Sequence, residues 1–283
     1  MPSLTLLGQS VLSGLFIGAL YGLLGLGLSL SWGLLNQINL AHFAFAFLGA
    51  YLTYQSSTVW GFDPLWTLVL IIPCFFLVGM AMHWVFARFE VTAFSSLLIT
   101  FGVTVVIESV IQWFWTADFR KLESHHAEIK WKIGAFYVPW PELLTLILAV
   151  GLSLAIWALL RHTDLGRALR AAAEDAPIAA AFGVNQRRLA LILSGTGTAL
   201  AGIAGVCLAL GFTLAPSQIY AWIGVVFAAV MIGGLGNPLG PLLAGVTIGV
   251  AEALTMAVTS PAWAPLVSFS LLILVLLLRP NKP

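Results

Sequence analysis

The chain has 283 residues, of which 60% are hydrophobic and 8% are charged, and its formal net charge is +1. An ordinary soluble domain carries about 25% charged residues, so this composition argues strongly against a soluble enzyme. It also argues against intrinsic disorder and nucleic-acid binding, because the chain has neither a high net charge nor a basic tract. We expect one transmembrane domain covering residues 1–283.

About nine apolar segments are long enough to be helices in a membrane, where the backbone must satisfy its own hydrogen bonds. The alternating pattern of a membrane β-barrel is absent. Two of the segments, 38–54 and 239–258, are short, so either could be a broken or re-entrant helix. The predicted fold is therefore all-α, a polytopic bundle of about eight or nine transmembrane or re-entrant helices. The segments are 10–32, 38–54, 63–84, 91–115, 141–160, 189–212, 217–235, 239–258 and 262–279.

Small residues recur along the first and sixth segments. They allow helix backbones to approach closely inside a membrane. We expect tight helix packing there, and the alternative is that these helices slide against each other during transport. The residues are Gly14, Gly18, Gly22, Gly25 and Gly27 in the first segment, and Gly195, Gly197, Ala201, Gly202 and Gly205 in the sixth.

Polar side chains inside apolar segments are the candidates for a transport path, because such groups are costly in hydrocarbon. A first cluster opens the short second segment, where we predict a broken helix whose free amides and side chains line the path. The alternative is hydrogen bonding between helices. Two isolated acids lie in later segments, where they either relay protons or hold helices together. The path candidates are Asn36, Asn39, His42, Glu108 and Glu252.

The longest extracytoplasmic stretch is the loop at about 116–140, which is rich in charged residues. It contains the adjacent residues His125 and His126. Neighbouring side chains diverge and no third ligand is evident, so we expect a solvated face and no metal site.

Residues 161–188 form a charged segment with the sequence RHTDLGRALRAAAEDAPIAAAFGVNQRR. Thr163 or Asp164 can cap a first helix. Pro177 suits the first turn of a second short helix, and Gly183 suits its C-terminal cap. The segment is therefore predicted to be two short helices joined at a bend.

The faces of these two helices carry many alanines, with charges at the rim. Such a low-relief surface could dock in a cleft on another protein, and the alternative is an ordinary connecting loop. The residues assigned to docking are Arg167, Arg170, Ala173, Glu174, Asp175, Pro177, Gly183 and Val184.

Lysine and arginine predict the orientation, because cytoplasmic loops carry more of them. If segment 161–188 is cytoplasmic and all nine segments cross, eight of these residues lie inside and four outside, with an outer N-terminus and an inner C-terminus. The inner residues are Arg88, Arg161, Arg167, Arg170, Arg187, Arg188, Arg279 and Lys282, and the outer ones are Arg120, Lys121, Lys130 and Lys132.

A glycine-rich stretch at 233–240 separates two apolar runs. No strand precedes it and its third glycine is misplaced for a dinucleotide-binding loop. We interpret it as a turn at the membrane face or a re-entrant bend, with a structural role. The break residues are Gly233, Gly234, Gly236, Pro238 and Gly240.

Several short motifs, in the same order along nearly the whole chain, resemble the permease subunits of branched-chain amino-acid ABC importers. The chain is most similar to the first of the two paired permeases. The motifs include Gln37-Ile38-Asn39-Leu40-Ala41-His42, Gly166-Arg167-Ala168, Ala173-Glu174-Asp175, Gly183-Val184-Asn185, Ala199-Leu200-Ala201-Gly202 and Met231-Ile232-Gly233-Gly234-Leu235-Gly236.

The resemblance implies a bacterial inner (plasma) membrane protein that forms a translocation path for branched-chain or other small amino acids. Its alternatives within the family are urea, short amides and aromatic acids. It implies four partners: a second homologous permease subunit in a heterodimer, two ATPase subunits, a soluble extracytoplasmic substrate-binding protein and membrane lipid. It also implies that segment 161–188 couples the chain to the ATPase subunits through Arg167, Arg170, Ala173, Glu174, Asp175, Pro177, Gly183 and Val184. The chain lacks the motif GxxxxGK[ST], so we expect it to bind no cofactor, with ATP and Mg²⁺ used by the partner subunits.

Two other classes of function remain as alternatives. An ion-coupled secondary transporter or channel needs paired intramembrane acids or a filter motif, whereas the acids here are few and isolated. An intramembrane enzyme needs a catalytic constellation, and neither His42 nor His83 has a matching nucleophile at a persuasive spacing. We therefore expect neither catalytic residues nor enzyme activity.

Overall fold

The computed structural model describes residues 3–278, which fold into a helical bundle with one small hairpin. Each of the nine predicted apolar segments forms a helix, so the predicted fold class is confirmed. The elements are α1 (Leu4–Leu35), α2 (Ala41–Trp60), α3 (Thr67–Arg88), α4 (Ala93–Trp115), α5 (His125–Glu128), β1 (Lys130–Ile133), β2 (Phe136–Pro139), α6 (Trp140–His162), α7 (Asp164–Glu174), α8 (Ala176–Ala181), α9 (Gln186–Gly211), η1 (Pro216–Gln218), α10 (Ile219–Gly233), α11 (Gly240–Val258), η2 (Pro261–Trp263) and α12 (Ala264–Leu278).

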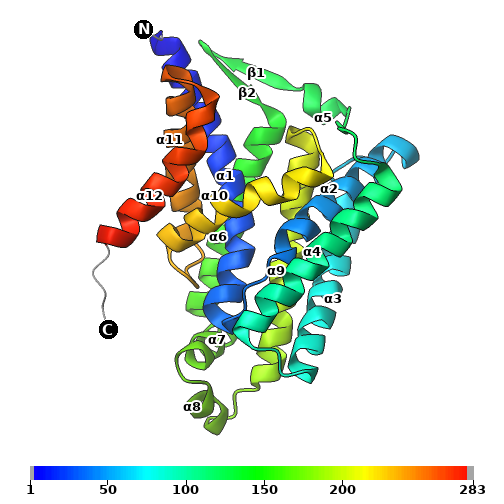
Figure 1. The fold of residues 1–283 in the computed structure, drawn as a ribbon, viewed down its shortest axis with the longest axis vertical. Helices are drawn as coiled ribbons and strands as arrows, with labels where there is room; N and C mark the ends of the chain where they lie inside the picture. Colours follow the sequence, from blue (N-terminus) through cyan, green and yellow to red (C-terminus); the bar gives the residue numbers. More distant parts are fainter. Residues whose placement is uncertain (1–2, 279–283) are drawn as a thin grey trace.

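Within the described residues, eight helical segments are long and apolar enough to cross a membrane. The short segment at 239–258 is one of them, as helix α11. Helix α2 is not, although it extends six residues beyond the predicted end of its segment. Its last turns carry the polar run 55–58, which lowers its apolar character. Helix α10 also differs from the others, because it runs across the bundle while α1, α6 and α9 run along it (Figure 1).

Helices α1 and α9 form the centre of the bundle. Helix α1 packs mainly against α11 and α9, while α9 packs mainly against α3, α2 and α1. Glycines permit these contacts: a Cβ atom on Gly18 would lie 2.5 Å from the carbonyl oxygen of Gly245, and one on Gly205 would lie 2.1 Å from that of Ala46. The predicted tight packing of the small-residue helices is therefore confirmed.

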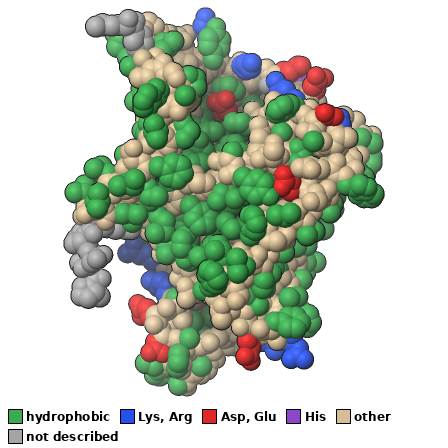
Figure 2. Space-filling model, in the orientation of Figure 1, with side chains coloured by type: hydrophobic (Ala, Val, Ile, Leu, Met, Phe, Trp, Pro, Cys, Tyr) green, Lys and Arg blue, Asp and Glu red, His purple; other side chains and the backbone are tan. Residues whose placement is uncertain are grey.

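The polar segments lie at opposite ends of the molecule. The N-terminus and the β1–β2 hairpin are at one end, and α7 and α8 are at the other (Figure 1). Charged side chains gather towards both ends, and hydrophobic side chains cover much of the surface between them (Figure 2). Which of the two ends faces the cytoplasm stays a prediction, and Arg279 and Lys282 lie outside the described residues.

The loop at 116–140 contains the only strands among the described residues, which the all-α prediction did not include. Strands β1 and β2 pair antiparallel, and Ile133 lies opposite Phe136. Two residues therefore form the turn, and the first of them, Gly134, has a φ of +63°. Such tight hairpin turns need positive φ, which glycine adopts without strain.

Helix α5 is tied to the connection between α2 and α3. The Nε2 atom of His126 donates to Oδ2 of Asp63 over 2.7 Å. Burial alone would raise the pKa of Asp63, but the hydrogen bonds from His126 and from the Leu65 N–H, together with the His126 charge, lower it below its ordinary value. No group of three or more potential metal-ligating side chains converges in the described part of the chain.

Candidate translocation path and coupling surface

The end of the molecule opposite the β1–β2 hairpin carries the predicted pair of short helices, α7 and α8, joined at a bend. Thr163, rather than Asp164, caps α7: its hydroxyl accepts a hydrogen bond from the Gly166 N–H over 3.1 Å. Asp175 caps α8 by accepting from the Ile178 N–H over 3.0 Å. We call residues 163–184 the elbow.

Gly183 follows the end of α8 with a φ of +84°, a conformation that favours glycine. The tip of the elbow is apolar and exposed. Phe182 is 85% exposed and Ile178, one helical turn before it, is 57% exposed. Adjacent exposed apolar side chains are typical of surfaces that contact another protein or a membrane.

An ion pair between Arg167 and Asp164 lies on the first turn of α7.

The elbow rests directly on the membrane helices. A Cβ atom on Gly166 would lie 2.4 Å from Cα of Leu160, so α7 is in close contact with the end of α6. Helix α7 also borders a cavity of about 310 Å³, whose walls include Ala172, Ala173 and, at the end of α1, Asn36. The elbow is therefore in contact with the point where α1 ends.

The predicted break between the first two segments is present at 36–40. Asn36 ends α1 in the left-handed conformation, with a φ of +53°. The hydroxyl of Thr100 on α4 accepts from the Leu40 N–H over 3.0 Å and donates to the Ile38 carbonyl over 3.3 Å. Asn39 is buried, and its Oδ1 has no hydrogen-bond partner among the described residues. The break is thus held by a side chain from another helix, while its role in lining a path stays a prediction.

The glycine-rich stretch at 233–240 forms the turn between α10 and α11. Gly234 and Gly236 have φ values of +91° and +75°, and α11 begins at Gly240. The Gly236 N–H donates to both the carbonyl and the hydroxyl of Ser29 on α1. A Cβ atom on Gly33 would lie 2.0 Å from the Gly236 nitrogen. The turn is therefore pressed against the last two turns of α1, close to the first break.

The remaining path candidates are not brought together. His42 is buried and donates from Nε2 to the Leu24 carbonyl over 2.9 Å. Glu108 lies on α4, where it accepts from the Tyr220 hydroxyl over 2.6 Å and from the Gln112 amide over 3.1 Å. Each of these side chains has a local partner on a neighbouring turn or helix, an arrangement expected of groups that hold helices together.

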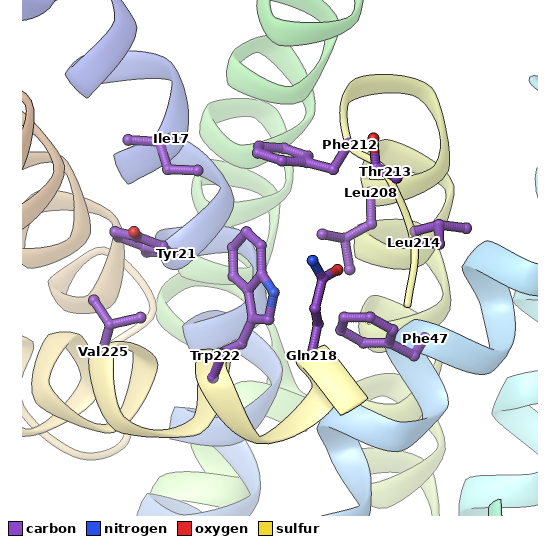
Figure 3. A pocket seen from close by; sticks show the side chains of 11 residues that line it. Ile17, Tyr21, Phe47, Leu208, Phe212, Thr213, Leu214, Gln218, Trp222 and Val225 are labelled. Carbon is purple, nitrogen blue, oxygen red and sulfur yellow. The ribbon is translucent and has the colours of Figure 1, made fainter. Parts of the chain in front are cut away.

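A cavity of about 310 Å³ lies between α1, α2, α9 and α10. Figure 3 shows Trp222 of α10 and Gln218, at the end of η1, pointing into the space between Tyr21 and Phe47. The indole of Trp222 makes edge contacts with the rings of Tyr21 and Phe212, with centroid distances of 5.8 and 5.5 Å. Aromatic walls with a few polar groups are typical of sites for small solutes that carry an apolar part.

Glu252 does not line this cavity, but it contacts Tyr21, which does. Its carboxylate is buried and accepts hydrogen bonds from the hydroxyls of Tyr21, over 2.9 Å, and Ser268. The acid therefore joins α1, α11 and α12 and fixes the tyrosine that lines the cavity. Sequence reasoning missed the cavity because its aromatic side chains look like ordinary core or interface residues. The one available signal was Gln218, a polar residue at the start of an apolar segment.

Comparison with known proteins identifies the family. Residues 10–276 match the family described as branched-chain amino acid transport system / permease component. The high-affinity branched-chain amino acid transport system permease protein LivH of Salmonella typhimurium is 27% identical over 96% of this chain and 94% of the relative. The corresponding LivH of Escherichia coli K12 is 26% identical over the same shares, and BraD of Pseudomonas aeruginosa is 24% identical over 99% of this chain and 96% of the relative.

No solved structure is significantly similar to this chain. The family matches and the eight candidate spans confirm the predicted multi-pass location in the inner membrane. A family match over residues 10–276 covers far more than half of the chain, and the resemblance predicted from its motifs is confirmed. The chain belongs to the branched-chain amino acid transport system permease component family.

Proposed function

We propose that this chain is the permease subunit of an ABC importer and forms the translocation path for branched-chain or other small amino acids. The observation that carries the proposal is the elbow, which presents an exposed apolar tip at one end of the bundle while contacting the broken end of α1. The chain lacks a phosphate-binding loop, so ATP and Mg²⁺ are used by two ATPase subunits, and the chain itself is not an enzyme.

The elbow supplies the contact through which ATPase movement reaches the path. Phe182 and Ile178 suit a groove on an ATPase subunit, as buried apolar anchors do in other interfaces. A shift of α7 acts on the end of α1 across the cavity that Ala172 and Ala173 line. The alanines leave room for this movement, because they fill little of the space between the helices.

The substrate class follows from the relatives and agrees with the aromatic cavity. The named relatives are branched-chain amino acid permeases. The cavity beside Trp222 has apolar walls for an aliphatic side chain and an amide, on Gln218, for a polar end. A soluble protein delivers the substrate at the outer end, and a second, homologous permease completes the membrane part in a heterodimer.

The test is uptake of labelled leucine into proteoliposomes that contain the chain with its second permease and ATPase subunits, plus the binding protein. We expect uptake that requires ATP inside and binding protein outside, and that valine and isoleucine compete for. Acetamide, urea and phenylalanine serve as competitors from the alternative substrate classes. Uptake driven by an ion gradient in vesicles without ATPase subunits would refute the proposal.

A further inference from the structure

A second cavity lies towards the outer end, beside the aromatic one. Its volume is about 240 Å³, and α1, α6, α9 and α11 supply its walls. It shares the lining residues Ile17 and Phe212 with the aromatic cavity, so the two spaces adjoin at these side chains. Apart from Glu142 and two hydroxyls, on Ser13 and Thr145, its lining side chains are apolar.

Glu142 lies in the first turn of α6 and lines this cavity. It is half-buried, and it makes no hydrogen bond or ion pair with any residue that the structure describes. The buried acid Glu252, in contrast, has two hydroxyl partners. Lys130 on β1 attracts the Glu142 carboxylate electrostatically. An acid in the first turn of a helix also interacts favourably with the helix dipole, but that interaction would not require the side chain to face a cavity.

The chemistry of the cavity points to one kind of ligand. A half-buried carboxylate without a partner favours a cation that can donate hydrogen bonds, and a charge-assisted bond of this kind is among the strongest in proteins. The apolar walls exclude a strongly hydrated ion but accept a short aliphatic chain. A primary ammonium on an aliphatic carbon meets both conditions.

We infer that the cavity beside Glu142 is an outer subsite that binds the ammonium group of an aliphatic amino acid before it reaches the aromatic cavity. The identity of the amino acid rests on the proposed function, whereas the preference for an aliphatic ammonium does not. Glu142 is the group that selects for the amine, and Ile17 and Phe212 divide the subsite from the space around Trp222.

The test uses a cysteine probe in the complete complex. Ser13→Cys places a thiol on the cavity wall, and a Cys74→Ala background removes the exposed native cysteine. The thiol reacts with a cationic reagent, 2-aminoethyl methanethiosulfonate, or with its neutral analogue, methyl methanethiosulfonate. We expect Glu142→Gln to lower the cationic-to-neutral rate ratio about tenfold, as loss of one charge-assisted contact implies. Glu142→Asp keeps the charge and should retain most of the ratio.

Thr259→Cys, an exposed position between α11 and η2, is the matched control. Its rate ratio should not respond to Glu142→Gln. Leucine should slow labelling at position 13, and 4-methylpentanoate, which has the same chain without the amine, should not. These readouts compare rates within one folded sample, so a purely structural role of Glu142 would not change them.

An unchanged rate ratio in Glu142→Gln would overturn the subsite. A changed ratio without protection by leucine would overturn its assignment to this amino acid. If the complex fails to import leucine while the ratio still depends on Glu142, the proposed function fails and the aliphatic ammonium subsite stands.

Discussion

The contact between α1 and α11 gives the sharpest test of the packing. A Cβ atom on Gly18 would lie 2.5 Å from both the Gly245 carbonyl oxygen and Cα of Val246. Both neighbours are backbone atoms, which cannot rotate away. Since ordinary contacts between carbon atoms are about 3.5–4.0 Å, the helices must separate by roughly 1 Å in Gly18→Ala.

Overpacking of this kind costs about 1–3 kcal/mol. Replacing a helical glycine by alanine also has an opposite effect, because alanine has the higher helix propensity and by itself stabilises the helix by up to about 1 kcal/mol. Gly151→Ala on α6 is the matched control, because nothing lies within 4 Å of the Cβ atom it adds. The propensity gain is common to both variants, so their difference in unfolding free energy isolates the contact at about 1–3 kcal/mol.

The measurement is reversible unfolding of the two purified variants in mixed micelles, followed by tryptophan fluorescence. We expect Gly18→Ala to unfold at a lower denaturant fraction than wild type and Gly151→Ala to unfold at an equal or higher one. Equal stability of the two variants would refute the close approach of α1 and α11.

Three further predictions concern function and pH. Phe182→Ala should weaken binding of the ATPase subunits by about 2 kcal/mol, or roughly 30-fold, and should reduce transport-linked ATP hydrolysis. Ile133→Ala, which changes an exposed residue at the hairpin end, should affect neither, and co-purification and ATPase assays measure both effects. Trp222→Ala removes two aromatic edge contacts worth about 0.5–1.5 kcal/mol each and should reduce leucine uptake about tenfold or more. The control is Trp113→Ala, which removes an 81% exposed side chain and should leave leucine uptake normal. The lowered pKa of Asp63 means that its contact with α5 stabilises the folded loop above the ordinary pKa of 3.8, and that this stabilisation is lost as pH falls through the lowered pKa. Hydrogen-exchange protection factors of residues 120–128, which correct for the intrinsic pH dependence of exchange, should therefore fall in acid in wild type and lack this step in Asp63→Asn.

The features that sequence predicted best are those set by neighbouring residues. The elbow was predictable because Thr163, Asp175 and Gly183 act on backbone groups within a few residues. The break at 36–40 was likewise visible as a polar interruption in apolar sequence. Its attachment to Thr100 was not, since 60 residues separate Leu40 from that hydroxyl and no local pattern links them.

The cavities could not be predicted because their walls come from distant parts of the chain. Tyr21 and Trp222 are about 200 residues apart, and only the crossing of α10 over α1 brings their rings together. Glu142 was overlooked for another reason: at the second position of a predicted segment, an acid is expected to stabilise the helix start. Its position in a cavity depends on the packing of α9 and α11 against α1, which sequence does not reveal.

The loop at 116–140 is joined to the segment before α10 by an isolated antiparallel β-bridge between Arg120 and Leu214. Arg120 N–H donates to the Leu214 carbonyl over 2.8 Å, and Leu214 N–H donates back over 2.7 Å. Leu214 also lines the aromatic cavity. A displacement of Arg120 would therefore act directly on the backbone of a residue in the cavity wall, so the loop at 116–140 and the cavity beside Trp222 are structurally coupled.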